Sequence, residues 1–413
     1  MAQSVLCVLW CCFSYVLMYT SVHGDPQQHS DSDDRENHVK ALSEMNNDFA
    51  FRLYKSIVSG AGAQSQNVFF SPLSVSMALA ALSLGAGGET HQQLFSGLGF
   101  NSSLFTSEEM HQAFLDLLQN LNQRTELDLN VGSAVYVNST FKPRPEFLEN
   151  LNRFYLSEGF SVDFSKQKET AKQINKYVIE KTHGKIRKFI KVLDTRTIMC
   201  LISYIYFKGK WSIPFRPQNT RKEEFYVDKE TTVQVEMMYE RNHFNAYFDP
   251  ELSTVAVRLD YNDSFSMILA LPDDLNVLQE ALHPHHIAHW NRQMRKRKYA
   301  LFLPKLSLKT SYFLNNILAR IGMKDLFTEK ANFTGITDEQ VYISEVVHKA
   351  TLDVDETGTT ATAVTRIHFG ARSRPSYLQF NEPFMIFIID QKTKNILFMG
   401  KIVNPANSEI TDE

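Results

Sequence analysis

The stretch from Thr351 to Asn381 combines residue types and spacing around which the rest of the chain is organised. It begins as a strand, in which Leu352 and Val354 alternate with two aspartates. From Thr357 to Thr365 it continues as small, uncharged residues. Such residues can lie exposed or pair as a strand, because threonine and valine favour extended backbone and nothing large requires burial.

Divided by the two-residue period of a strand, this segment has a small-to-apolar face and a face with the charged and imidazole groups. The first face would carry Thr359, Ala361, Ala363, Thr365, Ile367 and Phe369. The second would carry Thr360, Thr362, Val364, Arg366, His368 and Gly370. Two interpretations follow: a mobile surface loop between two strands, or a loop that can turn into a strand.

Motifs of enzyme chemistry are missing from the sequence. There is no G-x-S-x-G elbow, no H-E-x-x-H pair, no phosphate-binding P-loop and no complete dinucleotide fingerprint. The glycine-rich run Gly85–Gly88 lacks the final spacing of that fingerprint. The net charge of −3 also argues against bulk nucleic-acid binding. We therefore expect neither an enzyme nor a nucleic-acid-binding protein.

The elements that must position this stretch can be read from local signals. Ser71 and Pro72 predict the cap and first position of a helix that is apolar nearly all round and hence buried. The run Ile198–Phe207 is apolar enough to be a central strand, and two apolar strands flank the turn Gln391–Asn395. The composition, 43% hydrophobic over 413 residues without a flexible linker, predicts one large domain.

Several motifs together resemble the serpins, and in particular the secreted antitrypsin-like group. They are the 357–365 hinge, FKGKW at Phe207–Trp211, LPK at Leu303–Lys305 and FNEPF at Phe380–Phe384, within a resemblance covering about residues 46–405. It implies an α+β fold of about three β-sheets surrounded by eight to nine helices, with an exposed reactive loop. Serpins inhibit proteases: cleavage of the loop lets it insert into the main sheet.

The resemblance assigns roles to residues of the loop. The hinge would comprise Glu356, Gly358, Thr359, Ala361 and Ala363. The family's spacing from Glu356, and onward to Asn381, places the reactive bond at Arg372-Ser373. An arginine there would fill the acidic pocket of a trypsin-like protease. Arg374 and Arg366 are the alternatives, although Arg366 would leave too short an inserted strand.

Two further groups of residues follow from the resemblance. At the entry point of the loop, the breach, Lys305 would lie against Glu356, close to Trp211. Beneath the sheet, the shutter would contain Ser71, Ser74, Ser203 and His348. Serpins usually have asparagine where this chain has Ser203. Because serine is a shorter donor, we expect a looser or water-bridged shutter.

The N-terminus has the features of a secretory signal. Residues 1–24 combine an apolar run with a small-residue cleavage site, and the alternative of a membrane anchor is disfavoured by the shortness of that run. Removal of the segment would take away Cys7, Cys11 and Cys12 and leave Cys200, buried and without a disulfide partner. Residues 25–45 are expected to be an acidic disordered tail, and residues 46–413 the serpin domain, starting with a helix capped at Asn46–Asp48.

A basic cluster follows four histidines in the text HPHHIAHWNRQMRKRK. The cations are Arg292, Arg295, Lys296, Arg297 and Lys298, and the histidines are His283, His285, His286 and His289. The cluster is either a solvated helix face or a site for heparin-like glycans, as in some serpins with a similar basic helix. Zinc binding by the histidines is a third reading, without a closed ligand set. Glycosylation sequons occur at Asn101, Asn138, Asn262 and Asn332.

The sequence thus predicts a secreted, monomeric inhibitor of a trypsin-like serine protease, without a cofactor or metal, acting in coagulation or plasma proteolysis. The alternative is a non-inhibitory serpin that serves as a hormone carrier or scaffold. Such serpins often have bulky, charged or proline residues in the hinge, and Thr359–Thr365 has none. The hinge therefore favours inhibition.

Overall fold

The computed structural model describes residues 26–60, 63–103, 105–124, 128–262, 264–357, 376–407 and 409–411 of the chain. The predicted signal peptide and the loop segment 358–375, including Arg372 and Ser373, lie outside these residues. The described α-helices are α2 Pro26–Val58, α3 Pro72–Ser83, α4 Gly88–Gly97, α5 Ser107–Asn122, α6 Pro145–Tyr155, α7 Gln167–Lys181, α8 Leu275–Ala281, α9 Pro284–Gln293 and α10 Asn315–Arg320.

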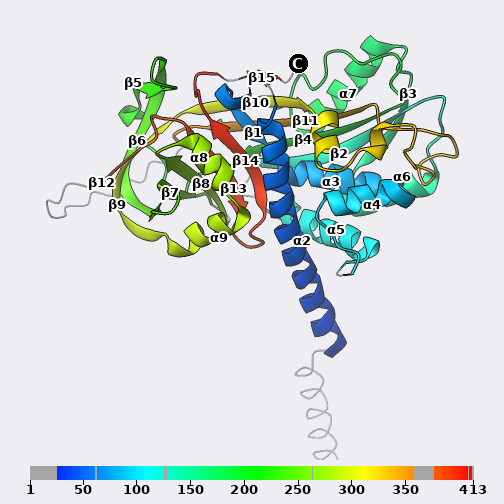
Figure 1. Cartoon of the computed structure of the whole chain (residues 1–413), viewed down its shortest axis with the longest axis horizontal. Helices are drawn as coiled ribbons and strands as arrows, with labels where there is room; N and C mark the ends of the chain where they lie inside the picture. The colour runs from blue at the N-terminus through cyan, green and yellow to red at the C-terminus, as the bar shows by residue number, and fades with distance from the viewer. Residues whose placement is uncertain are drawn as a thin grey trace, which may run out of the picture.

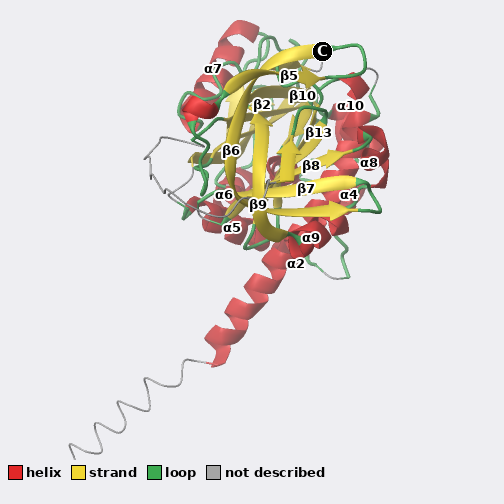
Figure 2. Ribbon diagram, turned by 90° about the vertical axis from the view of Figure 1, so that its left-hand side faces the viewer, coloured by secondary structure: helices red, strands yellow, loops and turns green. Residues whose placement is uncertain are grey.

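The strands form two hydrogen-bonded sheets within the described residues, surrounded by the helices (Figures 1 and 2). They are β1 Val68–Phe70, β2 Asp128–Asn138, β3 Glu158–Val162, β4 Met199–Lys208, β5 Arg221–Tyr226, β6 Thr232–Asp249, β7 Thr254–Asp260, β8 Phe265–Pro272, β9 Arg295–Pro304, β10 Leu306–Phe313, β11 Glu345–Val354, β12 Ser376–Gln379, β13 Phe384–Asp390, β14 Ile396–Ile402 and β15 Glu409–Thr411.

The first sheet has the order β15-β10-β11-β4-β2-β3, and the second runs β1-β14-β13-β8-β7-β6-β9-β12 with β5 added to β6. The long strand β6 explains why two sheets are seen where about three were expected. Its first part pairs with β5, its middle with β9 and its end with β7. One continuous 18-residue strand therefore joins what would otherwise be two separate sheets.

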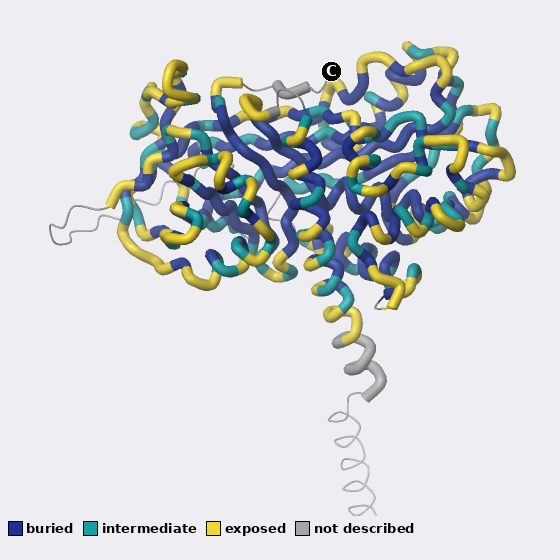
Figure 3. Tube along the Cα trace, viewed as in Figure 1, coloured by how far each residue is buried: buried dark blue, intermediate teal, exposed yellow. Residues whose placement is uncertain are grey.

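The central strand β4 of the six-stranded sheet is buried from Met199 to Phe207, whereas the outer strand β10 alternates buried and exposed residues; buried segments are dark blue in Figure 3. Along β4, Leu201 and Ile205 belong to the main core together with α3, whereas Ile202 and Tyr204 belong to a second core that includes residues of α7. The strand period of two sends alternate side chains to opposite faces. The apolar run predicted to be a central strand is therefore central, since β4 lies between β11 and β2.

Helix α3 follows its sequence signals. Ser71 is the N-cap, its hydroxyl accepts a hydrogen bond from the Ser74 backbone N–H at 3.2 Å, and Pro72 occupies the first helical position. Every residue of the helix is buried. The cap satisfies one of the backbone donors that a helix start leaves without an intrahelical partner, which matters at a fully buried terminus.

The expected disordered tail at residues 25–45 is wrong for the part that the structure describes, because α2 begins at Pro26. Val39 and Leu42 extend the apolar stripe of this helix toward the N-terminus and are 6% and 1% exposed. The sequence prediction missed this stripe because the segment is rich in acidic and polar residues. Of these, residues 34–37 are exposed on the helix. Figure 1 shows the start of α2 projecting from the body of the protein.

The predicted helix cap at Asn46–Asp48 is also wrong, because these residues lie inside α2. The asparagines instead hold the turn between β13 and β14. The Asn46 amide donates to Asn395 Oδ1 at 2.6 Å, and Asn47 Oδ1 accepts from the Ile396 backbone N–H at 2.8 Å. Each contact joins residues 349 positions apart in the sequence. A rule that considers only neighbouring residues therefore cannot tell these asparagines from helix caps.

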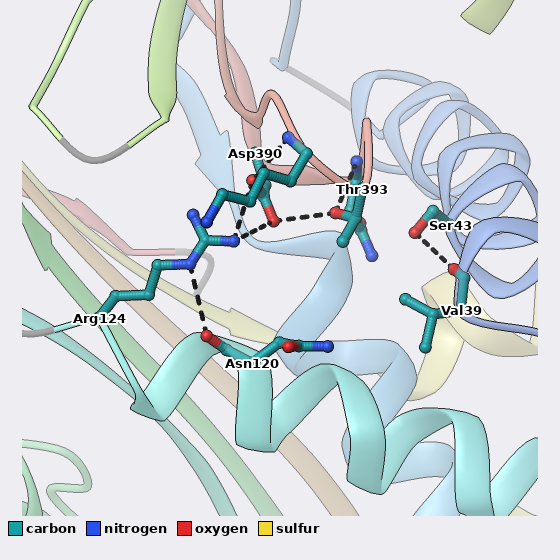
Figure 4. Close-up of polar contacts among 8 residues, drawn as sticks. Val39, Ser43, Asn120, Arg124, Asp390 and Thr393 are labelled. Atoms are coloured by element: carbon teal, nitrogen blue, oxygen red, sulfur yellow. Dashed lines mark hydrogen bonds and ion pairs between the residues drawn. The ribbon is translucent and has the colours of Figure 1, made fainter. Parts of the chain in front are cut away.

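The same β13–β14 turn is tied to the end of α5 by a buried ion pair (Figure 4). Arg124 Nη2 lies 3.1 Å from Asp390 Oδ2, and the two side chains are 6% and 1% exposed. The Arg124 guanidinium also lies 4.9 Å from the ring centre of Phe265. Asp390 accepts a further bond from the Thr393 hydroxyl at 3.0 Å, so its charge is compensated inside the protein.

Candidate functional site

The base of the predicted hinge is held by its backbone. Beyond the end of β11, the carbonyl of Asp355 accepts from the Trp211 indole N–H at 2.9 Å. The carbonyl of Glu356 accepts from the Phe215 N–H at 2.8 Å, and that of Thr357 from the Trp211 N–H at 3.4 Å. Three successive carbonyls are therefore bound by one short segment, 211–215. The chain that leads into the loop is fixed up to the last residue described before it.

The side chain of Glu356 adds a polar contact with two other segments. Lys305 Nζ lies 2.9 Å from Glu356 Oε2, and the Thr220 hydroxyl donates to Oε1 at 2.7 Å. The Glu356 side chain is only 11% exposed. Burial raises the pKa of this carboxyl, but the hydrogen bonds from Lys305 and Thr220 outweigh burial and hold the pKa below its ordinary value. The group is thus a carboxylate that clamps the hinge base to Lys305, between β9 and β10, and to residue 220.

A second polar cluster lies under the six-stranded sheet, where β4 and β11 pair side by side. His348 and Ser203 are register partners in this parallel pair, and the strand alternation turns both toward α3. His348 Nδ1 lies 3.3 Å from Ser203 Oγ and 3.4 Å from Ser74 Oγ. The two hydroxyls are themselves 3.1 Å apart. Ser203 thus contacts the Ser74 hydroxyl and the His348 ring directly, at 3.1 Å and 3.3 Å.

The hydrogen bonds assign the tautomer of His348. Its Nε2 accepts from the Ser71 backbone N–H at 3.1 Å and so carries no proton. In the neutral ring the proton then lies on Nδ1, from which it donates toward the serine hydroxyls. Complete burial lowers the pKa of His348 to about 3, against a smaller opposing effect of a hydrogen bond with the Ser203 backbone. The imidazole is therefore neutral at physiological pH.

The Lys305–Glu356 pair and the Ser203–His348 cluster both lie along the boundary between β4 and β11. Residues 345–352 of β11 pair with residues 200–207 of β4. A strand that entered between them would have to separate this ladder and break the Ser203–His348 contact. It would begin where Glu356 is held by Lys305. The Ser203–His348 cluster resists separation of β4 from β11 beneath the sheet, and the Lys305–Glu356 pair resists it at one end of the strands. This arrangement is mechanical and not catalytic.

The basic cluster is divided between two elements, which corrects the expectation of one basic helix. Arg292 lies in the last turn of α9, and Arg295–Lys298 form the start of β9, paired with β6. All five side chains are exposed. Strand alternation turns Lys296 toward one cavity and Arg295 and Arg297 toward another. A polyanion would therefore meet cations from two faces of a strand.

The histidines beside this cluster are close together but make no metal site. The ring centres of His285 and His286 are 4.0 Å apart, and His286 Nδ1 accepts from the His283 backbone N–H at 3.1 Å. Over the described residues, no group of three or more histidine, cysteine, aspartate or glutamate side chains could hold a metal ion. The zinc reading is contradicted for this part of the chain.

The four sequons differ in their surroundings. Asn101 is exposed, and its Oδ1 accepts from the backbone and hydroxyl of Ser103. Asn138 and Asn262 are half-buried. The Asn332 amide nitrogen lies only 3.0 Å from where a side chain on Gly87 would begin, so that it faces neighbouring backbone. Asn101 therefore offers the freest amide for a glycan, and Asn332 the most confined.

Sequence reasoning missed Thr220 and Phe215, which bind Glu356 from outside every recognised motif. Thr220 lies 136 residues from its partner, and no local pattern distinguishes it from other loop threonines. It also missed Lys208, whose Nζ lies 3.8 Å from Asp355 although FKGKW was recognised as a motif. Cys200 is buried as predicted, and burial raises the pKa of its thiol. No described helix combines the length and apolar character that crossing a membrane requires.

Comparison with known proteins assigns the family. The family model of the serpins, described as serine protease inhibitors, matches residues 44–405. Alpha-1-antichymotrypsin of Homo sapiens is 41% identical over 389 residues, which cover 92% of this chain and 92% of that protein. Plasma serine protease inhibitor of Mus musculus is 39% identical over 365 residues, covering 87% and 89%.

Solved structures agree in fold. The crystal structure of human thyroxine-binding globulin complexed with thyroxine superimposes with a TM-score of 0.84 at 34% identity, covering 89% of this chain and 99% of that one. The relatives named as inhibitors act on proteases and are not enzymes themselves. The matched range includes the segment 211–215, Lys305, Glu356 and the Ser203–His348 cluster. The chain belongs to the serpin family of serine protease inhibitors.

Proposed function

We propose that this serpin inhibits a trypsin-like serine protease as a suicide substrate, through cleavage at Arg372-Ser373 and insertion of the loop into the six-stranded sheet. The observation that carries the proposal is the way Asp355–Thr357 are held at the end of β11. The hinge is anchored by one segment and one ion pair at the edge of the β4–β11 boundary. Release there would give the loop a defined direction of entry.

The driving force is physical. Before cleavage, β4 and β11 pair with each other through slanted parallel bonds. After cleavage, the segment from Thr359 to Phe369 enters between them as a new strand, gains backbone hydrogen bonds and buries its small-to-apolar face. The free energy released displaces and distorts the protease that is covalently attached to Arg372 as an acyl-enzyme. The intact form therefore survives because of a kinetic barrier.

Inhibition is favoured over the carrier alternative by the hinge sequence. Thr359, Ala361 and Ala363 are small enough to be buried under a sheet, and no proline interrupts the strand between Thr359 and Thr365. The alternative has its own support, since thyroxine-binding globulin is a structural neighbour with a bound hormone. Chains of one fold can differ in function because function depends on local sites. The hinge is the site that separates these two functions.

The test is incubation of the secreted chain with a panel of trypsin-like proteases, with the cleavage site mapped by mass spectrometry. We expect a complex that survives SDS, and a product nicked after Arg372. Protein nicked in the loop should melt at a much higher temperature than intact protein. A carrier would be cut without complex formation and would show no rise in melting temperature.

We further propose that the basic cluster at Arg292 and Arg295–Lys298 binds heparin-like glycans and modulates inhibition. Five exposed cations within seven residues attract a polyanion by an interaction that salt screens. Heparin affinity chromatography should show elution at lower salt after Arg295→Gln and Arg297→Gln. Lys309→Gln, an exposed lysine on β10, is the matched control and should elute like the unaltered chain.

The proposed site of action is extracellular. Support comes from the signal-like residues 1–24, the sequons and the plasma inhibitor among the relatives. With an arginine at the reactive bond, the targets would be trypsin-like proteases of coagulation or plasma proteolysis. Expression in a mammalian cell should release a chain that starts after Gly24, with a glycan at Asn101. Retention of residues 1–24 in a cell-bound chain would contradict secretion.

A further inference from the structure

A cavity of about 300 Å³ lies directly behind the segment that holds the hinge. Its walls come from that segment, residues 211–215, and from the neighbouring strands β6, β7 and β9. Its apolar side chains come from the segment itself: Trp211 and Phe215, which are buried, and Ile213, which is half-buried. Such a volume is at the lower end of pockets that hold small organic molecules.

The polar groups of this cavity have an excess of positive charge. Arg258 and Asp260 form an ion pair at 2.8 Å, and Asp260 also accepts from the Ser266 hydroxyl at 2.8 Å. The single carboxylate of the lining is therefore compensated. Lys296 and His243 line the same cavity, and among the described residues neither has a carboxylate within ion-pair distance. Lys296 is one of the exposed cations of β9 and is free to turn toward a bound anion.

We propose that this cavity binds a small aromatic carboxylate, and that binding fixes the base of the hinge. An aromatic body would pack against the apolar wall at Trp211 and Ile213, and the carboxylate would pair with Lys296. A charge-assisted bond of this kind is stronger than one between neutral groups. The proposal therefore combines two independent features, an apolar wall on the segment 211–215 and an uncompensated cation on β9.

The coupling follows from two residues that serve both sites. Trp211 and Phe215 line the cavity, and the same two residues donate hydrogen bonds to the carbonyls of Asp355, Glu356 and Thr357. A ligand packed against them would favour the arrangement in which these bonds are made. A ligand shifts an equilibrium toward the state that it binds more tightly. Binding should thus oppose release of the hinge, and any consequence for inhibition rests on the proposed function.

The binding test uses 2-naphthoate as the probe and its neutral analogue 2-naphthylmethanol as the control ligand, with titration calorimetry on the full mature chain. Lys296→Gln should weaken 2-naphthoate binding about tenfold, as loss of one charged partner predicts. Lys298→Gln removes an equal charge two residues away, outside the cavity lining, and should leave affinity unchanged. Ile213→Trp, which fills the cavity from the half-buried wall, should abolish binding.

The location is checked by labelling with 5-fluorotryptophan. After removal of the leader, the tryptophans are Trp211 and Trp290, and only Trp211 lines the cavity. We expect 2-naphthoate to move the fluorine signal of Trp211 and to leave that of Trp290 in place. Equal affinity of the Lys296→Gln and Lys298→Gln variants, or a Trp211 signal that does not move, would overturn the site.

The coupling between the cavity and the hinge base is measured without a protease, by hydrogen exchange of the peptide that contains residues 209–216. Binding should slow exchange of the Trp211 and Phe215 amides, because their bonds to the hinge carbonyls would open less often. Unchanged exchange with bound probe would refute the coupling and leave the site standing. If the protein forms no complex with any protease, the proposed function is wrong. The binding titration and the hydrogen-exchange measurement would still test the cavity and its coupling to the hinge.

Discussion

Lys305 and Glu356 form a contact of 2.9 Å between residues 51 positions apart, at the point where the strand β11 gives way to the loop. The contact is completed by Thr220, so that three separate segments meet at one carboxylate. Because the same residue is bound through its backbone to Phe215, the base of the hinge cannot move without losing both sets of bonds. If the loop inserts as proposed, these bonds at the hinge base would have to break first.

Lys305→Met should speed spontaneous loop insertion. The change leaves the Glu356 carboxylate with Thr220 alone, at a cost to the intact state of about 1–3 kcal/mol. We expect faster loss of inhibitory activity at a fixed elevated temperature, together with more polymer on native gels. Lys309→Met, at an exposed position of the adjoining strand β10, is the control and should behave like the unaltered chain. Equal rates for the two variants would show that the breach contact does not limit insertion.

Thr359→Arg should turn the inhibitor into a substrate. By the two-residue alternation of the sequence, Thr359 would be buried on insertion, and an arginine there would carry an unpaired charge under the sheet. Gel analysis after mixing with trypsin should show cleaved chain in place of the SDS-resistant complex. Thr360→Arg, on the opposite face of the strand, should retain much more complex. Persistent complex formation by Thr359→Arg would count against the insertion mechanism.

Acid should destabilise the native state through His348. Its pKa is about 3 in the folded protein and near 6.5 when unfolded, so between these values only the unfolded chain binds the proton. Stability is thus lost as the pH falls below about 6.5, and this loss amounts to about 2 kcal/mol between pH 7 and pH 5.

Urea midpoints measured at these two pH values for the unaltered chain and for His348→Asn would check this. The variant should be less stable at pH 7 but should lose less stability on acidification. Some pH dependence will remain, because burial also lowers the pKa of His111 to about 4. A variant with the same pH dependence as the unaltered chain would exclude His348 as the titrating group.

Arg124→Met should be strongly destabilising. It leaves Asp390 charged at 1% exposure, for which a cost of roughly 3–5 kcal/mol is typical. Adding Asp390→Asn should recover part of this loss, because the buried charge is then removed as well. Arg144→Met breaks an ion pair with Asp338 that is exposed on both sides and should cost less than about 1 kcal/mol. Chemical denaturation of the unaltered chain and these variants measures the differences directly.

The sequence by itself determined those features that depend on neighbouring residues. Ser71 and Pro72 predicted the start of α3, and the apolar run around Cys200 predicted a buried central strand. The terminal hairpin follows from two apolar runs and a turn. These signals act within a few positions of the chain, because capping, turn formation and strand alternation are local properties of the backbone.

Only the tertiary structure decided which distant groups meet. The pairing register of β4 with β11 places Ser203 opposite His348, and the path of residues 211–220 brings Thr220 to Glu356. Packing of α2 buries Val39 and Leu42, although the acidic composition of this segment predicts disorder. The basic cluster likewise divided between α9 and β9. Contacts across such sequence separations depend on sheet register and on packing, which no local pattern specifies.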